Sequence, residues 1–397
     1  MSKVDGTATA PLRVVLWGTC DTGKPRVRIL RDGLRANGVD LVECRVDIWS
    51  AIQDKSQLKG ASRWIGLLAR VVLAYPALIW RYLRLPRHDW VLLGYPAIPD
   101  IFVIRLFAWL RGSPVAMDWF LSAYDTVVED RKLVGKRHPL AWVLRGVEWM
   151  AVRLADVVFM DTRAHAARME AVFGLQAGAC GRVWVGVEDS VFDGSCVAAS
   201  GPSGQVAPMQ VAPMQVGPMR VLFYGQFIPL HGLSTIIEAS RELRDEPIDW
   251  LLIGRGQESE RVQAMLREVP LARVSLLEWV EYEDLLGHIH DADVCLGIFG
   301  TSDKATSVIP NKVFQILAAH KPLITRDSPG IRELAGDAYA DIALVEAGNA
   351  RVLADALLAW RNKPPASDPR RGALVARFTP AAIGRQCIEM LMQRQPS

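Results

Sequence analysis

The sequence lacks the features that mark secreted, zinc-binding or membrane-spanning proteins. Its 6 cysteines include no Cys-x-x-Cys pair and no close histidine that would complete a zinc site, so they predict reduced, buried thiols. Residues 1–12 lack the apolar run of a secretory signal. The longest apolar stretch, 65–80, is interrupted by Arg70 and Pro76 and is shorter than the ~18 residues of a transmembrane helix. We therefore expect a cytoplasmic protein without a membrane span.

Charge of one sign is also scarce. The chain has 46 Lys and Arg against 43 Asp and Glu, a net charge of +3, which does not predict a nucleic-acid partner. Residues 1–200 hold 26 basic and 20 acidic residues, so this half carries +6 and the rest −3. The first predicted strand is not followed by a G-x-G-x-x-G motif, and a Walker lysine motif is missing, which disfavours dehydrogenases and P-loop ATPases.

The chain does contain enough apolar material for two domains, since 50% of its 397 residues are hydrophobic. Near its middle, three copies of a Gln-Val-Ala/Gly-Pro-Met unit follow a Gly-Pro-Ser-Gly segment. Proline in every unit excludes a helix and disrupts a sheet ladder, and the P-x-x-P spacing of docking ligands is missing. We therefore expect a linker at 201–219 between domains at 1–200 and 220–378, with a final helical segment at 379–397.

On both sides of this linker, short β-rich runs alternate with helical patterns, as is typical of parallel sheets with crossover helices. We predict an α/β protein with two Rossmann-like, doubly wound domains. Ligands of such sheets bind outside the carboxyl ends of the strands, so we expect the active site in the cleft between the domains. The predicted strands are 14–17, 41–46, 90–93, 115–117, 157–160 and 183–185, then 220–224, 249–253, 274–276, 294–298, 323–325 and 343–345, and the first and last helices are 25–37 and 380–393.

Three turns of the second half follow predicted strands and lead into helices. They are 225–233, 254–257 and 299–312, and each contains glycine. A glycine turn before a helix exposes backbone N–H groups to an anion, and the helix dipole favours negative charge there. Lys312 and Gln315 are three residues apart and so share one face of the last helix. The turns predict a diphosphate site, although each of them alone is also compatible with an ordinary tight turn.

In this order and spacing, segment 224–346 resembles the donor-binding domain of the retaining group 1 (family four) glycosyltransferases, which have the two-domain GT-B fold. The amino-terminal half is compatible with this family. The resemblance implies a hexosyltransferase-type enzyme that transfers a sugar, with retention of configuration, from a UDP- or GDP-type nucleotide sugar. The acceptor would be a glycan or lipid-linked hydroxyl in cell-envelope or exopolysaccharide biosynthesis. Neither a metal nor a cofactor is implied, and we expect the last helix to pack back on the N-terminal domain.

The resemblance also implies roles for individual residues. The turn from Gly225 to Gly232 would face the diphosphate, Gln315 would hold the ribose, and Asp118, His231 and Lys312 are the candidate catalytic residues. The full donor-binding set is Gly18, Gly225, Gln226, His231, Gly232, Gly254, Arg255, Gly256, Trp279, Val280, Gly300, Thr301, Asn311, Lys312, Gln315 and Glu333.

The phosphate turn departs from the family pattern, because Gln226 and His231 stand where an Arg and a Lys are usual. A charge-assisted hydrogen bond contributes roughly 1.5–3 kcal/mol, so Lys312, Arg255 or protonated His231 would have to compensate. We expect a bound diphosphate to raise the pKa of His231 above its ordinary ~6.5. The competing interpretation is that His231 merely caps the following helix.

A second group of candidates follows the strand at 115–117 in the first half. Asp118, Tyr124, Asp125 and Arg131 lie at a strand end that faces the predicted cleft. They predict acceptor binding or assistance by a general base, with a salt-bridged loop as the alternative.

Segment 59–112 is rich in basic and aromatic residues, with eight Lys or Arg against Asp89 and Asp100. This composition fits helices that lie on an anionic membrane surface, which would suit a lipid-linked acceptor. Crossover helices packed on the sheet with arginines outside are the alternative.

Two other functions remain open. A nucleotide-sugar epimerase of the same fold would bind the donor without an acceptor. A non-catalytic homologue that binds the donor is the third reading, because Gln226, Ser307 and Gln315 replace charged residues of the family.

Overall fold

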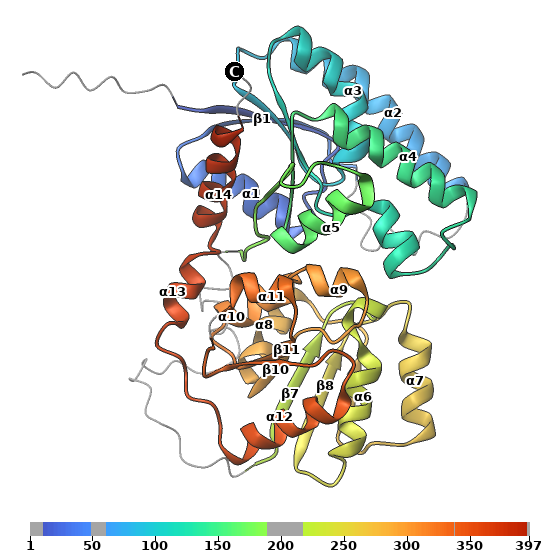
Figure 1. Cartoon of the computed structure of the whole chain (residues 1–397), viewed down its shortest axis with the longest axis vertical. Helices are drawn as coiled ribbons and strands as arrows, with labels where there is room; N and C mark the ends of the chain where they lie inside the picture. Colours follow the sequence, from blue (N-terminus) through green and yellow to red (C-terminus); the bar gives the residue numbers. More distant parts are fainter. Residues whose placement is uncertain (1–10, 49–60, 189–216, 337, 395–397) are drawn as a thin grey trace, which may run out of the picture.

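The computed structural model describes residues 11–48, 61–188, 217–336 and 338–394, and within them the chain forms two six-stranded sheets (Figure 1). The paired strands of both sheets run parallel. Helices cover the two faces of each sheet, which confirms the predicted pair of doubly wound domains. The repeat that we interpret as a linker lies almost entirely outside the described residues.

The N-terminal sheet has the order β2-β1-β3-β4-β5-β6. Its central strands are apolar and buried along their whole length, because helices pack on both faces. The strands are β1 (Arg13–Gly18), β2 (Asp40–Arg45), β3 (Trp90–Leu93), β4 (Val115–Asp118), β5 (Val157–Met160) and β6 (Cys180–Arg182), and the helices are α1 (Pro25–Ala36), α2 (Ala61–Leu83), α3 (Ala97–Leu110), the π-helical turn η2 (Asp125–Asp130), α4 (Pro139–Leu154) and α5 (Arg163–Phe173).

The C-terminal sheet has the order β12-β11-β10-β7-β8-β9. Its strands are β7 (Met219–Tyr224), β8 (Ile248–Ile253), β9 (Val274–Leu277), β10 (Val294–Leu296), β11 (Leu323–Arg326) and β12 (Ile342–Val345). Its helices are the 3-10 turn η5 (Pro229–His231), α6 (Leu233–Glu242), α7 (Ser259–Glu268), α8 (Tyr282–Asp291), α9 (Asp303–Ser307), α10 (Asn311–Ala318), α11 (Pro329–Leu334) and α12 (Ala350–Asn362).

The end of the chain returns to the N-terminal domain, as expected. After α13 (Arg371–Ala376), helix α14 (Pro380–Gln393) packs along α1 (Figure 1). The two helices approach closely because Gly33 faces Gly384, and a Cβ on Gly384 would lie 2.0 Å from the Gly33 carbonyl oxygen. The helix begins where its sequence predicts, since Thr379 accepts a hydrogen bond from Ala382 N and Pro380 occupies the first turn.

Two expectations can be compared with the structure in detail. The strand predicted at 183–185 was wrong, because the pairing with β5 falls on 180–182, and of the buried apolar residues that follow, Val183 still donates a hydrogen bond to the Met160 carbonyl at the end of β5. Cys20, Cys44, Cys180, Cys295 and Cys387 are free and buried, as expected for reduced thiols, whereas Cys196 lies outside the described residues.

Candidate functional site between the domains

The first part of the site is formed by three turns of the C-terminal domain that pack backbone against backbone. The turn after β7 has positive φ at Gly225 (137°) and Gly232 (65°). A Cβ on Gly254 would lie 1.9 Å from the Gly225 carbonyl oxygen, and one on Gly232 would lie 2.5 Å from Gly300 N. Gly256 meets the backbone of Phe227 in the same way. These contacts leave no room for a Cβ, so they require glycine. They bring together five predicted donor-binding positions, which are Gly225, Gly232, Gly254, Gly256 and Gly300.

Lys312 lies beneath the first of these turns. It is the second residue of α10, is 6% exposed, and its Nζ lies 3.7 Å from the centre of the Phe223 ring. Its one hydrogen-bond acceptor among the described residues is the Gly297 carbonyl, at 3.5 Å. A Cβ on Gly225 would lie 3.1 Å from Nζ, so the ammonium group adjoins the backbone of the turn. Burial without a carboxylate partner lowers the pKa of Lys312 well below its ordinary value.

His231 lies on the other side of the same glycine. Its Cε1 would be 3.1 Å from a Cβ on Gly225, and its Nδ1 hydrogen-bonds the carbonyl oxygen of Gln226. Burial, followed by the charge of Lys312, lowers the pKa of His231 well below its ordinary value. In the ligand-free protein the shift is thus opposite to the one that we expect with a diphosphate bound. The structure also gives the helix-cap interpretation no support, because the side chain makes no cap hydrogen bond to α6.

A cavity of about 250 Å³ opens beside the turn. Its apolar lining includes Tyr224, Ile253, Trp279 and Val280. Trp279 is 57% exposed, so one ring face is available to a ligand. A flat apolar slot of this kind suits a planar base, with the remaining lining provided by Gly225, Gln226, Gly254, Arg255, Glu278, Tyr282 and Leu285.

Gln315 lies one turn after Lys312 on α10 and is buried. Its Oε1 accepts a hydrogen bond of 3.1 Å from the hydroxyl of Tyr224, which also approaches the Lys312 carbonyl oxygen at 3.3 Å. The amide NH2 group of Gln315 remains available as a donor. At the start of the helix, Oδ1 of Asn311 is buried and has no hydrogen-bond partner among the described residues, whereas Thr301 is exposed.

The N-terminal domain reaches this site through the end of η2. Arg131 Nη2 lies 3.4 Å from Gln226 Oε1, and Gln257 Nε2 donates a 3.0 Å hydrogen bond to the Arg131 carbonyl. Arg131 is therefore a predicted acceptor-side residue that contacts the C-terminal domain directly.

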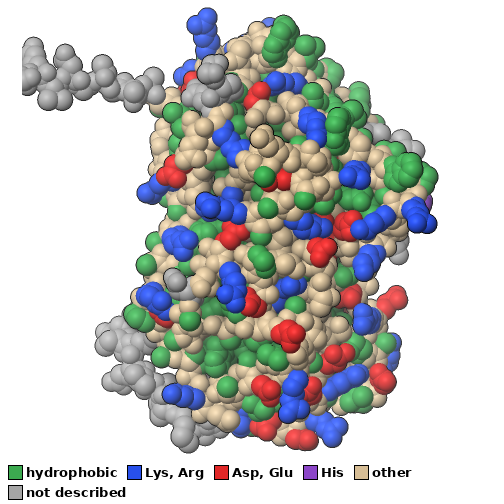
Figure 2. All heavy atoms as spheres, in the orientation of Figure 1, with side chains coloured by type: hydrophobic (Ala, Val, Ile, Leu, Met, Phe, Trp, Pro, Cys, Tyr) green, Lys and Arg blue, Asp and Glu red, His purple; other side chains and the backbone are tan. Residues whose placement is uncertain are grey.

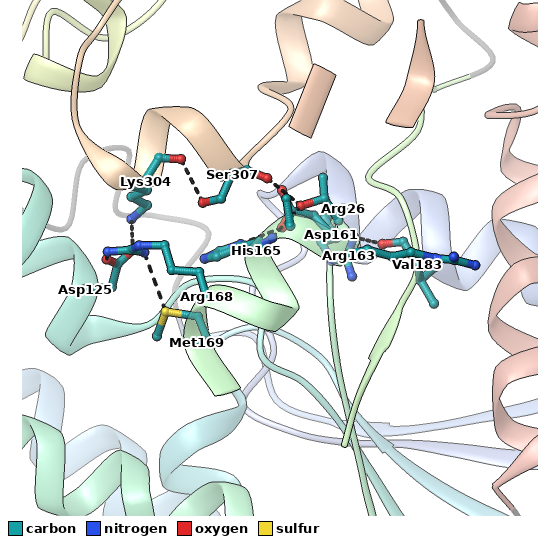
Figure 3. Close-up of polar contacts among 12 residues, drawn as sticks. Arg26, Asp125, Asp161, Arg163, His165, Arg168, Met169, Val183, Lys304 and Ser307 are labelled. Atoms are coloured by element: carbon teal, nitrogen blue, oxygen red, sulfur yellow. Dashed lines mark hydrogen bonds and ion pairs between the residues drawn. The ribbon is translucent and has the colours of Figure 1, made fainter. Parts of the chain in front are cut away.

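Asp125 and Tyr124 lie in the same segment, and each contacts a protein partner, as Figure 3 shows for Asp125. Arg168 Nη2 donates a 2.5 Å hydrogen bond to Asp125 Oδ1, and Lys304 Nζ from α9 lies 3.4 Å from its Oδ2. The hydroxyl of Tyr124 donates to Glu129. The salt-bridged alternative therefore describes Asp125, whose carboxylate joins the two domains.

Asp118 is placed away from the pocket, contrary to our expectation of a catalytic group. It ends β4 at 1% exposure, and both carboxylate oxygens accept hydrogen bonds of 2.7–3.0 Å from the guanidinium of Arg26. Burial raises its pKa while Arg26 opposes the shift. A carboxylate held in this way joins β4 to α1, and a catalytic role for Asp118 stays a prediction.

Gly18 and Glu333 are also placed outside the donor pocket. Gly18 (φ 111°) packs against the buried carboxylate of Asp100, which would lie 2.1 Å from a Cβ. Glu333 accepts hydrogen bonds from Arg163 N (3.0 Å) and Ala164 N (2.7 Å). It thus caps the first turn of α5 in the other domain.

Sequence reasoning missed several polar residues at the domain boundary. Thr162 Oγ1 donates to the Ser307 carbonyl at 2.5 Å, and the buried Asp161 and His165 form a pair at 2.6 Å (Figure 3). Thr162 is the N-cap of α5, and its side chain accepts a hydrogen bond from His165 N. A Thr at this position is a local signal that could have located the start of the helix. The partner of Thr162, in contrast, lies 145 residues away in the chain, and no local pattern indicates it.

Comparison with known proteins identifies the carboxyl-terminal half. Residues 218–362 match the family model described as glycosyl transferases group 1. The match shows that this domain is similar to the group 1 glycosyltransferases. A putative colanic acid biosynthesis glycosyl transferase of Escherichia coli (strain K12) is 29% identical to the chain over 98 residues, which span 25% of this chain and 24% of that relative. The family model covers the three glycine turns, Lys312 and Gln315.

Solved structures resemble the whole chain and establish its GT-B fold. HepE of Anabaena, crystallised in complex with UDP, has a TM-score of 0.61 at 14% identity, covering 96% of this chain and 100% of its own. A glycosyltransferase from Rickettsia africae has a TM-score of 0.63 at 12% identity, covering 97% and 99%. The apo form of the lipopolysaccharide outer core galactosyltransferase WaaB has 0.60 at 12%, covering 97% and 100%.

Proposed function

We propose that this protein transfers a hexose, with retention of anomeric configuration, from a nucleotide-diphosphate sugar to an acceptor hydroxyl in the biosynthesis of a cell-envelope or exported glycan. The observation that carries the proposal is Lys312, a buried ammonium group without a carboxylate partner among the described residues, beside the glycine turn that begins the group 1 domain. An anionic ligand at the turn would restore the favoured charge of this lysine. The adjoining slot has the shape and apolar lining for the base.

In the proposed reaction, the acceptor oxygen forms a bond to the anomeric carbon as the bond from that carbon to the diphosphate oxygen breaks. The acceptor hydroxyl proton passes to the departing diphosphate on the same face of the sugar. The protein stabilises the negative charge that develops on the leaving group, through Lys312 and the backbone N–H groups at the turn. None of these steps requires a general base from Asp118 or a metal ion.

Binding of nucleotides tests this proposal. We would titrate UDP, GDP, ADP, CMP and dTDP by calorimetry, with and without magnesium, and UDP is the first choice because HepE was crystallised with it. Sub-millimolar binding of one nucleotide without magnesium, followed by acceptor-dependent loss of the nucleotide sugar, is the expected result. Conversion of the sugar without acceptor would indicate the epimerase, and tight binding without turnover the non-catalytic homologue. Binding of none would overturn the donor site.

The outer face of the N-terminal domain supports a membrane-associated acceptor. Apolar side chains gather where α2, α3 and α4 lie, at the upper right of Figure 2. The most exposed are Leu73 (76%), Trp142 (71%) and Trp109 (67%), and the same face includes Val72, Trp80, Leu83, Phe102, Leu106, Leu110, Leu140, Val143, Trp149 and Met150. Patches of this kind on a single domain mark interaction surfaces.

The charges on this face favour an anionic bilayer. Helix α2 has no acidic residue, and the acidic residues of α3 and α4, Asp100 and Glu148, are buried. Exposed arginines flank the apolar side chains at positions 70, 81, 84, 145 and 153. None of the helices in the described residues is long and apolar enough to cross a membrane. We therefore propose that the face rests on the surface of the cytoplasmic membrane, where a lipid-linked acceptor would be available.

Co-sedimentation with vesicles tests the membrane contact. Trp109→Glu combined with Trp142→Glu is expected to reduce binding to vesicles containing anionic lipid by at least about 10-fold, since two aromatic anchors are lost. Met392→Glu, at a 54% exposed apolar position on α14, is the matched control and should not change binding. Equal binding by the double variant and the control, or no binding by the wild type, would overturn this part of the proposal.

A further inference from the structure

We propose that Arg131, although it belongs to the N-terminal domain, supplies the second cation to the donor diphosphate and so replaces the basic residue that the turn lacks at Gln226. This inference rests on the proposed function, because it assigns a further ligand to the same donor site. It moves Arg131 from the acceptor side, where its sequence position places it, to the donor.

The backbone at Arg131 is fixed against the donor domain. Its carbonyl oxygen accepts a 3.0 Å hydrogen bond from Gln257 Nε2 in the turn after β8. The neighbouring carboxylate, Asp130, is 3.3 Å from Ser302 Oγ in the turn before α9. Two turns of the C-terminal domain therefore hold this end of η2 over the phosphate turn, so that the Arg131 side chain extends toward Gln226.

The guanidinium of Arg131 has N–H donors that make no hydrogen bond to the described residues. Its contact with Gln226 Oε1, at 3.4 Å, is at the long limit for a hydrogen bond and involves a neutral acceptor. Its Nε is buried and has no partner. In the described parts of the chain, no carboxylate lies within ion-pair distance of this side chain, whereas Arg26 and Arg168 are each paired with an aspartate. A planar fork with free donors fits two phosphate oxygens much better than one amide oxygen.

The surroundings leave the positive charge of Arg131 largely uncompensated at the mouth of the cleft. Burial and the charge of Asp21 raise the pKa of Tyr95 to about 12, and the charge of Arg131 opposes this shift. Asp130 is the other charged neighbour, and Lys304 acts on it more strongly than Arg131 does. On the donor side, Lys312 and Gly225 adjoin each other directly beside Gln226. A diphosphate at the turn would thus have one cation below it and one from the opposite domain.

A cation on the opposite domain has a consequence that a cation in the turn would lack. The diphosphate would be bound by both domains at once, so donor binding and closure of the cleft would be thermodynamically linked. A nucleoside without phosphates would occupy the slot between Tyr224 and Trp279 without engaging Arg131. The contribution of Arg131 should therefore depend on the phosphates alone.

The experiment compares UDP with uridine by calorimetry, or GDP with guanosine if guanine is selected. Arg131→Gln is expected to weaken UDP about 10- to 100-fold, the loss of one charge-assisted contact, and to leave uridine unchanged. Lys132→Gln, the same charge loss one residue later, should change neither, because Lys132 is exposed. Moving the cation back, in Arg131→Gln with Gln226→Arg, is expected to restore most of the UDP affinity.

The possible results separate the two proposals. If wild-type protein binds no nucleotide, the proposed function fails together with this inference. If it binds UDP and Arg131→Gln binds UDP equally well, or loses UDP and uridine in parallel, the role of Arg131 is refuted and the donor site stands. Should the Gln variant not fold, Arg131→Lys keeps the charge without the fork, and it must still lower UDP affinity selectively, by a smaller factor, for the inference to survive.

Discussion

In the N-terminal domain, Asp118 is buried with Arg26 as a bidentate partner, whereas in the C-terminal domain the buried Lys312 has no carboxylate partner among the described residues and contacts the Gly297 carbonyl and the Phe223 ring. Both charges lie at the cleft-facing side of a parallel sheet. The first is neutralised by the fold itself, through a contact between β4 and α1. The charge of Lys312 has no such counter-ion among the described residues.

A buried charged group with a protein partner stabilises the fold, whereas a buried charged group without one is a candidate for ligand binding. Asp125, Glu148 and Asp161 of the N-terminal domain all have protein partners. Among the described residues of the C-terminal domain, Oδ1 of Asn311 has no hydrogen-bond partner and Nζ of Lys312 has one carbonyl acceptor, and buried polar groups of this kind are candidates for ligand binding. Residue type alone does not distinguish the two, since Asp118 and Lys312 are both plausible catalytic residues.

The largest expected effect is on the buried pair of the N-terminal domain. Asp118→Asn leaves the Arg26 charge buried without a counter-ion and should lower the free energy of unfolding by about 3–5 kcal/mol in urea. Asp40→Asn, in an exposed pair with Arg13, should cost less than about 1 kcal/mol. A stable Asp118→Asn protein that binds donor but no longer transfers sugar would instead restore Asp118 as a catalytic group.

Glu148 provides a pH-dependent test of the same domain. Burial raises the pKa of Glu148 to about 7, so between about 4.5 and 7 the folded state holds more protons than the unfolded state and stability falls as pH rises. Glu148→Gln keeps the contacts to Ser122 and Ala123 and should be more stable than wild type at pH 8, by up to about 3 kcal/mol, but not at pH 4. Thermal unfolding at both pH values measures this, with the exposed Glu238→Gln as a control that should show no such difference.

Lys312 should behave in the opposite way to Asp118. Lys312→Met is expected to weaken nucleotide binding by about 10- to 100-fold while leaving the ligand-free protein at least as stable, because a buried charge is removed. Burial lowers the pKa of Lys312 in the folded state, so between that pKa and ~10 the unfolded chain holds more protons than the folded protein. The stability of the wild type relative to Lys312→Met should therefore increase as pH rises through this range. Calorimetry and melting curves test both, with the exposed Lys363→Met as control. A destabilised variant with normal nucleotide affinity would make Lys312 structural.

The smallest effect is expected at Glu333. Glu333→Ala removes the acceptors of two N–H groups in the first turn of α5, where Thr162 remains as the N-cap, and should lower the free energy of unfolding by about 0.5–2 kcal/mol without a change in nucleotide affinity. The exposed Glu260→Ala should leave both quantities unchanged. Weaker nucleotide binding by Glu333→Ala would show that the donor-binding role implied by the family resemblance is correct after all.

The elements of this protein could be predicted because their signals are local. Alternating apolar runs and helical patterns predicted both sheets, and Thr379 with Pro380 predicted the start of α14. The glycines of the donor turns could be recognised for the same reason, because each follows a strand directly. The one misplaced strand, at 183–185, is apolar but pairs three residues earlier, since its register depends on β5.

The amino-acid sequence by itself determined the two doubly wound domains, the glycine turns and the joint position of Lys312 and Gln315 on one helix, because neighbouring residues decide these features. The tertiary structure alone decided which charges are used internally. Asp118 meets Arg26 across 92 residues, and Glu333 meets Ala164 across 169. It also decided that Arg131 reaches Gln226, 95 residues away. Such pairs form where the topology brings two strand ends or helix ends together, and no local pattern records them.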